Sequence, residues 1–209
     1  YSFFVTYANI DGYTPSETAF EALTNPMDRW IISAMQRFVE GATTAFDAYD
    51  IQKACSLFVP FIDDLNNWYI RRSRRRFWKG ENDVDKKQAY DTLYKVLMTF
   101  IKVVAPIIPF TTEEIYQNLR SDNSESSVHL CLYPAYDGGQ RDLVLESQMA
   151  LTQKAIAMGR SLRASNNLKI RQPLRKLFLV DREKQERDIL NSMQDIIAEE
   201  LNVKAVRIE

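Results

Sequence analysis

The chain has 209 residues, a formal net charge of −1 and 45% hydrophobic residues. These values fit a folded protein of one large or two small domains, and the low content of six Gly and seven Pro argues against a β-sandwich or a disordered linker protein. Even the apolar run "IKVVAPIIPF" is cut by Pro106 and Pro109, so we expect no membrane-spanning segment. The two cysteines, Cys55 and Cys131, favour a reducing compartment, with the cytoplasm as the expectation.

The first 24 residues contain the aromatic stretch "YSFFVTYANIDGY", which has the composition of an extended segment. The first residue is Tyr rather than Met, and the stretch does not resemble a secretion signal. We therefore interpret the chain as part of a longer polypeptide and residues 1–24 as a linker from a preceding domain.

Residues 25–125 show the apolar spacing of a helical bundle. Asn25 followed by Pro26 is typical of a helix start, and the apolar period continues to Phe46. Asp50 can cap a second helix that runs through the arginines of the seventies, with a kink at Pro60. A third helix ends before Pro106, and "TTEE" at 111–114 fits a capping box that begins a fourth helix.

The composition changes after residue 125, where a polar loop is followed by "VHLCLYP", which predicts a short strand. The remaining pattern predicts a helix over 143–165, a strand over 176–180, a helix over 183–201 and a strand over 203–208. The predicted fold is therefore mainly α: a helical bundle over 25–125 and a small α/β subdomain over 126–209.

The segment "NNWYIRRSRRRFWKG" contains five arginines and a lysine. At 100° per residue, Arg72 and Arg76 lie close to the direction of Leu65 on the apolar face, whereas the other arginines fan to one side. Two interpretations of Arg72 and Arg76 stay open: RNA contact, or pairing with buried acids such as Asp63, Asp64 or Glu113. For Arg71, Arg74 and Arg75 we expect contact with phosphate, and the alternative is a surface helix with ordinary ion pairs.

Arginine suits phosphate because its planar fork donates two parallel hydrogen bonds. Aromatic side chains beside it can stack on unpaired bases, which RNA loops expose. Trp68 is expected in the core, Phe77 could stack, and Trp78 points away from the apolar face and is the better stacking candidate. The predicted RNA-binding residues are Arg71, Arg74, Arg75, Trp78 and Lys79, together with Arg72 and Arg76.

A second basic stretch, "GRSLRASNNLKIRQPLRK", contains Arg163, Lys169 and Arg171. These residues are a second set of candidate RNA contacts, but the same pattern is equally expected for a solvated connection between a helix and a strand. The sequence does not decide between the two.

Several segments together resemble the class I isoleucyl-tRNA synthetase family. They are "YSFFVTYANIDGY", "NNWYIRRSRRRFW", "VAPIIPFTTEEIYQNL", "SVHLCLYP", "KIRQPL" and "ELNVKAV", in the family's order and over essentially the whole chain. The resemblance is to the region that follows the catalytic domain, an anticodon-binding helical bundle and the start of a C-terminal domain. It implies a monomeric, cytoplasmic ligase that joins isoleucine to its tRNA with ATP and magnesium, and whose catalytic and editing domains belong to the same polypeptide.

The family's catalytic signatures HIGH and KMSKS are absent from this sequence. The single histidine, His129, has no nucleophile or carboxylate partner in a motif, so we predict no catalytic residue and no cofactor in this chain. No pair of cysteines has metal-binding spacing, and we predict no metal site. Two alternatives remain: the same region of a valyl or leucyl relative, or a basic-helix module that binds proteins or acidic membrane surfaces.

Overall fold

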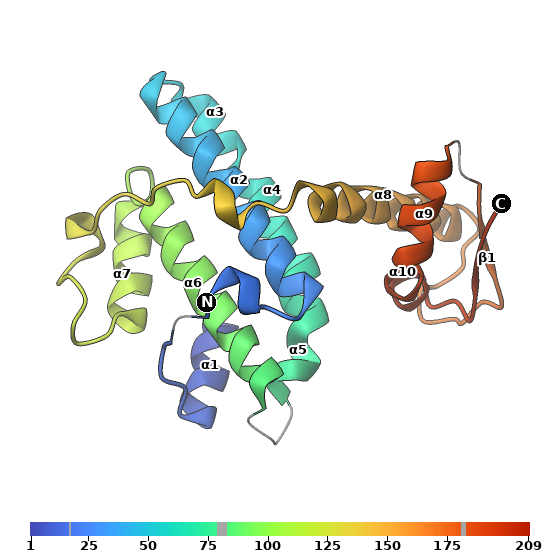
Figure 1. Ribbon diagram of the computed structural model, residues 1–209, viewed down its shortest axis with the longest axis horizontal. Helices are drawn as coiled ribbons and strands as arrows, with labels where there is room; N and C mark the ends of the chain where they lie inside the picture. Colours follow the sequence, from blue (N-terminus) through green and yellow to red (C-terminus); the bar gives the residue numbers. More distant parts are fainter. Residues whose placement is uncertain (17, 79–82, 181–182) are drawn as a thin grey trace. The chain divides into compact units, whose positions relative to one another are not determined.

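The computed structural model describes residues 1–16, 18–78, 83–180 and 183–209. The chain forms two compact units, Tyr1–Asp142 and Leu143–Glu209 (Figure 1). The division falls 17 residues later than the predicted boundary after residue 125, because the segment before it is bound to the bundle. The backbone N–H of Asp142 donates to Ser33 Oγ at 2.8 Å, and that of Asp137 donates to Gln36 Oε1 at 2.9 Å.

The first unit is helical. Its long helices are α2 (Pro26–Asp47) and α6 (Val84–Val104), which pack against each other at its centre (Figure 1). The Asn25 side chain caps α2 by accepting from Met27 N at 2.9 Å, as predicted. The shorter helices are α1 (Ser2–Asp11), α3 (Ile51–Ser56), α4 (Phe58–Asp63), a π-helical segment (Asp64–Ile70), α5 (Arg71–Trp78) and α7 (Pro109–Leu119). The 3₁₀ turns Phe20–Ala22, Val128–Leu130 and Gly138–Gln140 also belong to this unit.

The N-terminal residues form a helix and not the extended linker that their aromatic composition suggested. Helix α1 lies beside α6 (Figure 1), and Phe4 is buried there, 6.1 Å from the ring of Tyr90. Phe3 packs edge-on against Phe77 at 5.2 Å. The aromatic spacing places these rings on one helical face, which makes residues 1–24 part of the first unit.

Asp91 of α6 fixes the segment that follows α1. Its carboxylate accepts from the hydroxyls of Tyr13 at 2.7 Å, Ser16 at 2.8 Å and Thr18 at 2.6 Å, and pairs with Lys87 at 2.9 Å. Burial by itself raises the pKa of Asp91, but these hydrogen bonds outweigh it and hold the pKa below its ordinary value.

Two local predictions of the first unit are wrong. Helix α7 begins at Pro109 and not at a capping box, and Thr112 donates to the carbonyls of Ile108 and Pro109. Glu113 accepts from Val128 N at 2.9 Å. The residues expected as a strand form a 3₁₀ turn, Val128–Leu130, because this contact with α7 takes up the backbone donor that a ladder would use.

The second unit contains α8 (Leu143–Ser165), β1 (Leu177–Leu179), α9 (Lys184–Ser192), α10 (Gln194–Leu201) and β2 (Val206–Ile208). The strands are parallel, with Phe178 opposite Arg207. One predicted helix is broken at Met193 into α9 and α10. At Gly159 of α8 an added Cβ would lie 2.5 Å from Leu201 Cδ1, so glycine allows α10 to approach closely. The predicted fold class, a helical bundle with a small α/β unit, is confirmed.

Candidate nucleic-acid interface

The π-helical segment Asp64–Ile70 changes which side of α5 faces the core. A π turn contains an extra residue and shifts all following positions around the helix axis. Ser73, Arg76 and Phe77 are the buried residues of α5. Ser73 therefore takes the inward position that uniform α-helical spacing assigned to Arg72, and Arg72 is only half-buried.

Arg76 is a structural ion-pair residue. Its guanidinium donates to both oxygens of Asp28 at 2.7 Å, and also contacts the carboxylate of Asp85 at 2.9 Å. Arg76 is 7% exposed and Asp28 is fully buried. Burial favours the neutral guanidine, but the hydrogen bonds and charge of Asp28 outweigh it and raise the pKa of Arg76. We therefore remove Arg76 from the candidate RNA contacts.

The acids expected to pair with the inward arginines, Asp63, Asp64 and Glu113, are not the partners of Arg76. Asp64 lies 3.5 Å from Arg37, and Asp63 accepts from Asn67. The actual partner, Asp28, was missed, although it lies at helical spacing from Ile31, Ile32 and Met35 of the apolar face of α2. An acid within such a stripe is the signal that could have identified it, because a buried carboxylate requires a cation or several donors. The Tyr69 hydroxyl also donates to Asp28, at 2.8 Å.

Arg71, Arg74 and Arg75 are exposed, as the helical wheel predicted. Their spacing of three and four residues places them on one face of α5. We call these three residues the arginine face. Arg71 Nε donates to the carbonyl of Asn67 at 2.7 Å. Because Arg76 is clamped inside by Asp28, the rotation of α5 is fixed and the arginine face is held outward.

The aromatic residues near the arginine face divide between core and surface. Trp68 is buried, as expected, and Phe77 is 1% exposed with its ring edge-on to Tyr90 at 4.9 Å. Phe77 is therefore unavailable for stacking. Trp78 is 57% exposed, and its indole N–H donates to the hydroxyl of Tyr7 at 2.6 Å. The predicted RNA contact Lys79 lies outside the described residues.

Tyr7 is a residue that the sequence analysis missed, because its segment was interpreted as extended. It lies on α1 and also packs against Phe3, with ring centroids 4.9 Å apart. The α1 helix thus orients Trp78 through one hydrogen bond. The aromatic spacing within residues 3–7 was the available signal.

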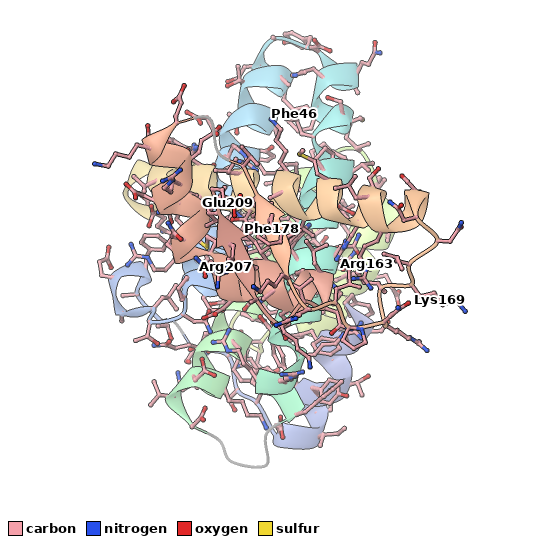
Figure 2. The ribbon with its side chains drawn as sticks, turned by 90° about the vertical axis from the view of Figure 1, so that its right-hand side faces the viewer. Phe46, Arg163, Lys169, Phe178, Arg207 and Glu209 are labelled. Carbon is pink, nitrogen blue, oxygen red and sulfur yellow. The ribbon has the colours of Figure 1, made fainter. Side chains whose placement is uncertain are left out.

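The second basic stretch also divides between interior and surface. Arg163 is 6% exposed and donates to the backbone carbonyls of Leu201 at 3.3 Å, Gln172 at 2.5 Å and Lys169. It anchors the loop after α8 to the end of α10, so it is not placed to contact RNA. Lys169 and Arg171 are exposed on that loop, and Lys169 extends outward in Figure 2.

The model of the anticodon-binding domain of tRNA ligases matches residues 28–178, which include α5 and most of the first unit. The chain belongs to this family. The match contains the arginine face, Arg76 and its partner Asp28. It also extends through α8 to β1, so the family's region is not confined to the first compact unit.

Relatives of this chain support the resemblance to isoleucyl-tRNA synthetases. The isoleucine–tRNA ligase of Treponema denticola is 49% identical over 99% of the chain, that of Treponema pallidum 46% over 98%, and that of Dehalococcoides mccartyi 44% over 100%. The chain spans 20% of the length of the two Treponema proteins and 21% of that from Dehalococcoides.

Within the part of the chain that the structure describes, no helix is long and apolar enough to cross a membrane. The described carboxyl groups with lowered pKa values, Asp11, Asp91 and Glu113, all accept structural hydrogen bonds. The arginine face of α5 is suited to holding an anion.

Proposed function

We propose that the chain binds isoleucine tRNA, as the anticodon-binding region of an isoleucine–tRNA ligase. The observation that supports this proposal is the division of α5 into a buried anchor, Arg76, and the exposed arginine face. Family membership supports the class of RNA, and the names of the relatives support isoleucine.

The chemistry of the arginine face fits an RNA backbone. Arg71 and Arg75 are like charges one helical turn apart, an arrangement that destabilises an isolated helix by a few tenths of a kcal/mol. A row of phosphates offsets this repulsion and accepts the guanidinium forks in bidentate fashion. Trp78 lies next to the face and offers an exposed ring for a base in the unpaired loop.

The activity of the longer enzyme is also a proposal. ATP, magnesium, aminoacylation and editing belong to domains outside this chain, because the HIGH and KMSKS signatures are absent from its sequence. We expect the isolated chain to be monomeric, to act in the cytoplasm and to show no isoleucine-dependent exchange of pyrophosphate with ATP. Detectable exchange would contradict this assignment of roles.

Filter binding with isoleucine tRNA and valine tRNA at several salt concentrations tests the proposal. The arginine face, Lys169 and Arg171 supply up to about five phosphate contacts, so the logarithm of affinity should fall against the logarithm of salt with a slope of about −3 to −5. A slope near zero would contradict an arginine–phosphate interface. Equal affinity for both tRNAs would place isoleucine specificity elsewhere, and equally tight binding to anionic vesicles would favour a membrane-surface module.

A further inference from the structure

The two-stranded sheet of the second unit has one open face. Successive residues of a strand point to opposite faces, and in both strands the middle residue is exposed while its neighbours are half-buried. The middle residues are Phe178, which is 54% exposed, and Arg207 directly opposite it. Figure 2 shows the two residues near each other on the adjacent strands.

Two basic residues flank this ring, Arg207 on β2 and Lys176 just before β1. Lys176 and Val180 adjoin the two ends of β1, two positions before and after Phe178, and both are exposed. The alternation of an extended chain places them on the same side as Phe178. No Asp or Glu occurs between Glu146 and Asp181 in the sequence. Glu209, two positions after Arg207, is an exposed acid at the edge of this face. An exposed aromatic ring therefore has a cation along its own strand and another across the sheet.

This combination favours a nucleotide over a covering protein segment. A protein layer that buried Phe178 would also remove Lys176 and Arg207 from water, which is unfavourable for any charge that the layer does not pair. A nucleotide supplies both complements at once: a base with an apolar π-face for the ring, and a phosphate for the cations. The surface of a β-sheet with exposed aromatics is a general means of holding unpaired bases.

We propose that Phe178, Arg207 and Lys176 form a second RNA site, which binds an unpaired ribonucleotide. The base stacks on Phe178, and the adjoining phosphate lies between Arg207 and Lys176. A base within a duplex has its faces covered by its neighbours, so the site selects unpaired nucleotides. The inference rests on the proposed function, that this chain binds tRNA, and adds a place on the second unit that contacts an unpaired part of it.

The test measures binding of a short, labelled, unpaired oligoribonucleotide and of isoleucine tRNA to the 209-residue chain by fluorescence anisotropy. Phe178→Ala should weaken oligonucleotide binding about tenfold, which is within the range for loss of one base–aromatic stack. Phe178→Trp should retain it. Phe110→Ala is the matched control, because Phe110 is also an exposed phenylalanine, 89% exposed on α7, and its loss should change nothing.

Three further results sharpen the test. Arg207→Gln should weaken binding and reduce the salt slope by about one, whereas Glu209→Gln should strengthen binding. A blunt RNA duplex should bind with equal affinity to the wild type and to Phe178→Ala. A fall in melting temperature for both Phe178→Ala and Phe178→Trp, without a selective loss of RNA affinity, would show that the ring packs within the protein and would overturn the site.

The outcomes also separate this inference from the proposed function. If the wild type binds tRNA, and Phe178→Ala and Phe110→Ala bind the oligonucleotide equally well, the sheet site is wrong and the proposed function stands. If the chain binds no tRNA at any salt concentration, the proposed function fails and the sheet site fails with it.

Discussion

Arg76 in the first unit and Arg163 in the second lie within basic stretches of similar composition, and both are buried. Their buried guanidinium groups have different hydrogen-bond acceptors. Arg76 is held by the carboxylates of Asp28 and Asp85, whereas Arg163 is held by backbone carbonyls, including that of Leu201 at the end of α10. The first is an ion pair, and the second uses the partial negative charge of a helix C-terminus.

The difference shows that one residue of a charge run can be a structural anchor for its neighbours. Arg76 fixes the rotation of α5, which turns Arg71, Arg74 and Arg75 toward solvent. Arg163 fixes the loop that carries Lys169. An ion pair leaves a bare buried charge when one partner is removed, whereas loss of Arg163 leaves neutral carbonyls. The anchors should therefore differ in strength.

Replacing the ion-pair anchor should have the largest effect on stability. Arg76→Ala leaves the carboxylate of Asp28, which is fully buried, without its main counter-charge, and should lower the free energy of unfolding by about 3 kcal/mol or more. Urea denaturation followed by circular dichroism measures the change. Arg74→Ala, an exposed arginine of the same helix, is the control and should stay near wild type. Equal stability of the two variants would contradict the claim that Arg76 anchors α5 through its ion pair with Asp28.

Replacing the carbonyl-bound anchor should cost less. Arg163→Ala leaves three carbonyls, one buried and two partly buried, without this donor, and we expect the free energy of unfolding to fall by about 2 kcal/mol. Amide hydrogen exchange should show reduced protection in α8 and α10, with protection in α2 and α6 retained, because the two compact units have separate cores. Arg171→Ala, exposed on the same loop, is the control. If Arg163→Ala lowered the free energy of unfolding as much as Arg76→Ala does, the predicted difference in strength between the two anchors would be wrong.

Acid should destabilise the first unit more than the second. The anchor of the first unit depends on ionised carboxylates, whereas the anchor of the second unit, Arg163, is bound by backbone carbonyls. The pKa of Asp91 is lowered in the folded state, so its ionised form stabilises the fold above its ordinary value of about 3.9. That contribution disappears as the pH falls through the folded-state pKa.

Hydrogen exchange at pH 3 and pH 6 should show a larger loss of protection in α6 than in α8. Asp91→Asn should lose about 1 kcal/mol at pH 6 and respond less to acid. An acid response that is unchanged in this variant would show that other carboxylates control it.

The exposed arginines should affect binding and not stability. Arg71→Ala combined with Arg75→Ala should change the free energy of unfolding by less than about 0.5 kcal/mol per site. The affinity for isoleucine tRNA should fall, and the salt slope should shrink by about one for each arginine–phosphate pair that the substitutions remove. Lys53→Ala, an exposed cation on α3, is the control. Loss of stability without loss of affinity would show that the arginine face serves the fold.

The sequence by itself determined the helical bundle, the cap of α2 at Asn25 and the bounds of α8, since these depend on local apolar spacing and capping. It also predicted that Arg71, Arg74 and Arg75 are exposed. The prediction of an extended segment at the position of α1 was wrong, because it relied on aromatic composition alone. The strand expected near Val128 was likewise a local preference that packing against α7 overrode.

Only the tertiary structure decided which arginines are anchors. The π-helical segment shifts the face of α5 by one residue, and the partner of Arg76 is 48 residues away in the sequence, on α2. The same holds for Phe178 and Arg207, which a parallel pairing brings opposite each other. Local spacing determines which residues share one helix or strand. The pairing of a buried charge, however, depends on which elements meet in space, because its free energy comes from interactions between distant parts of the chain.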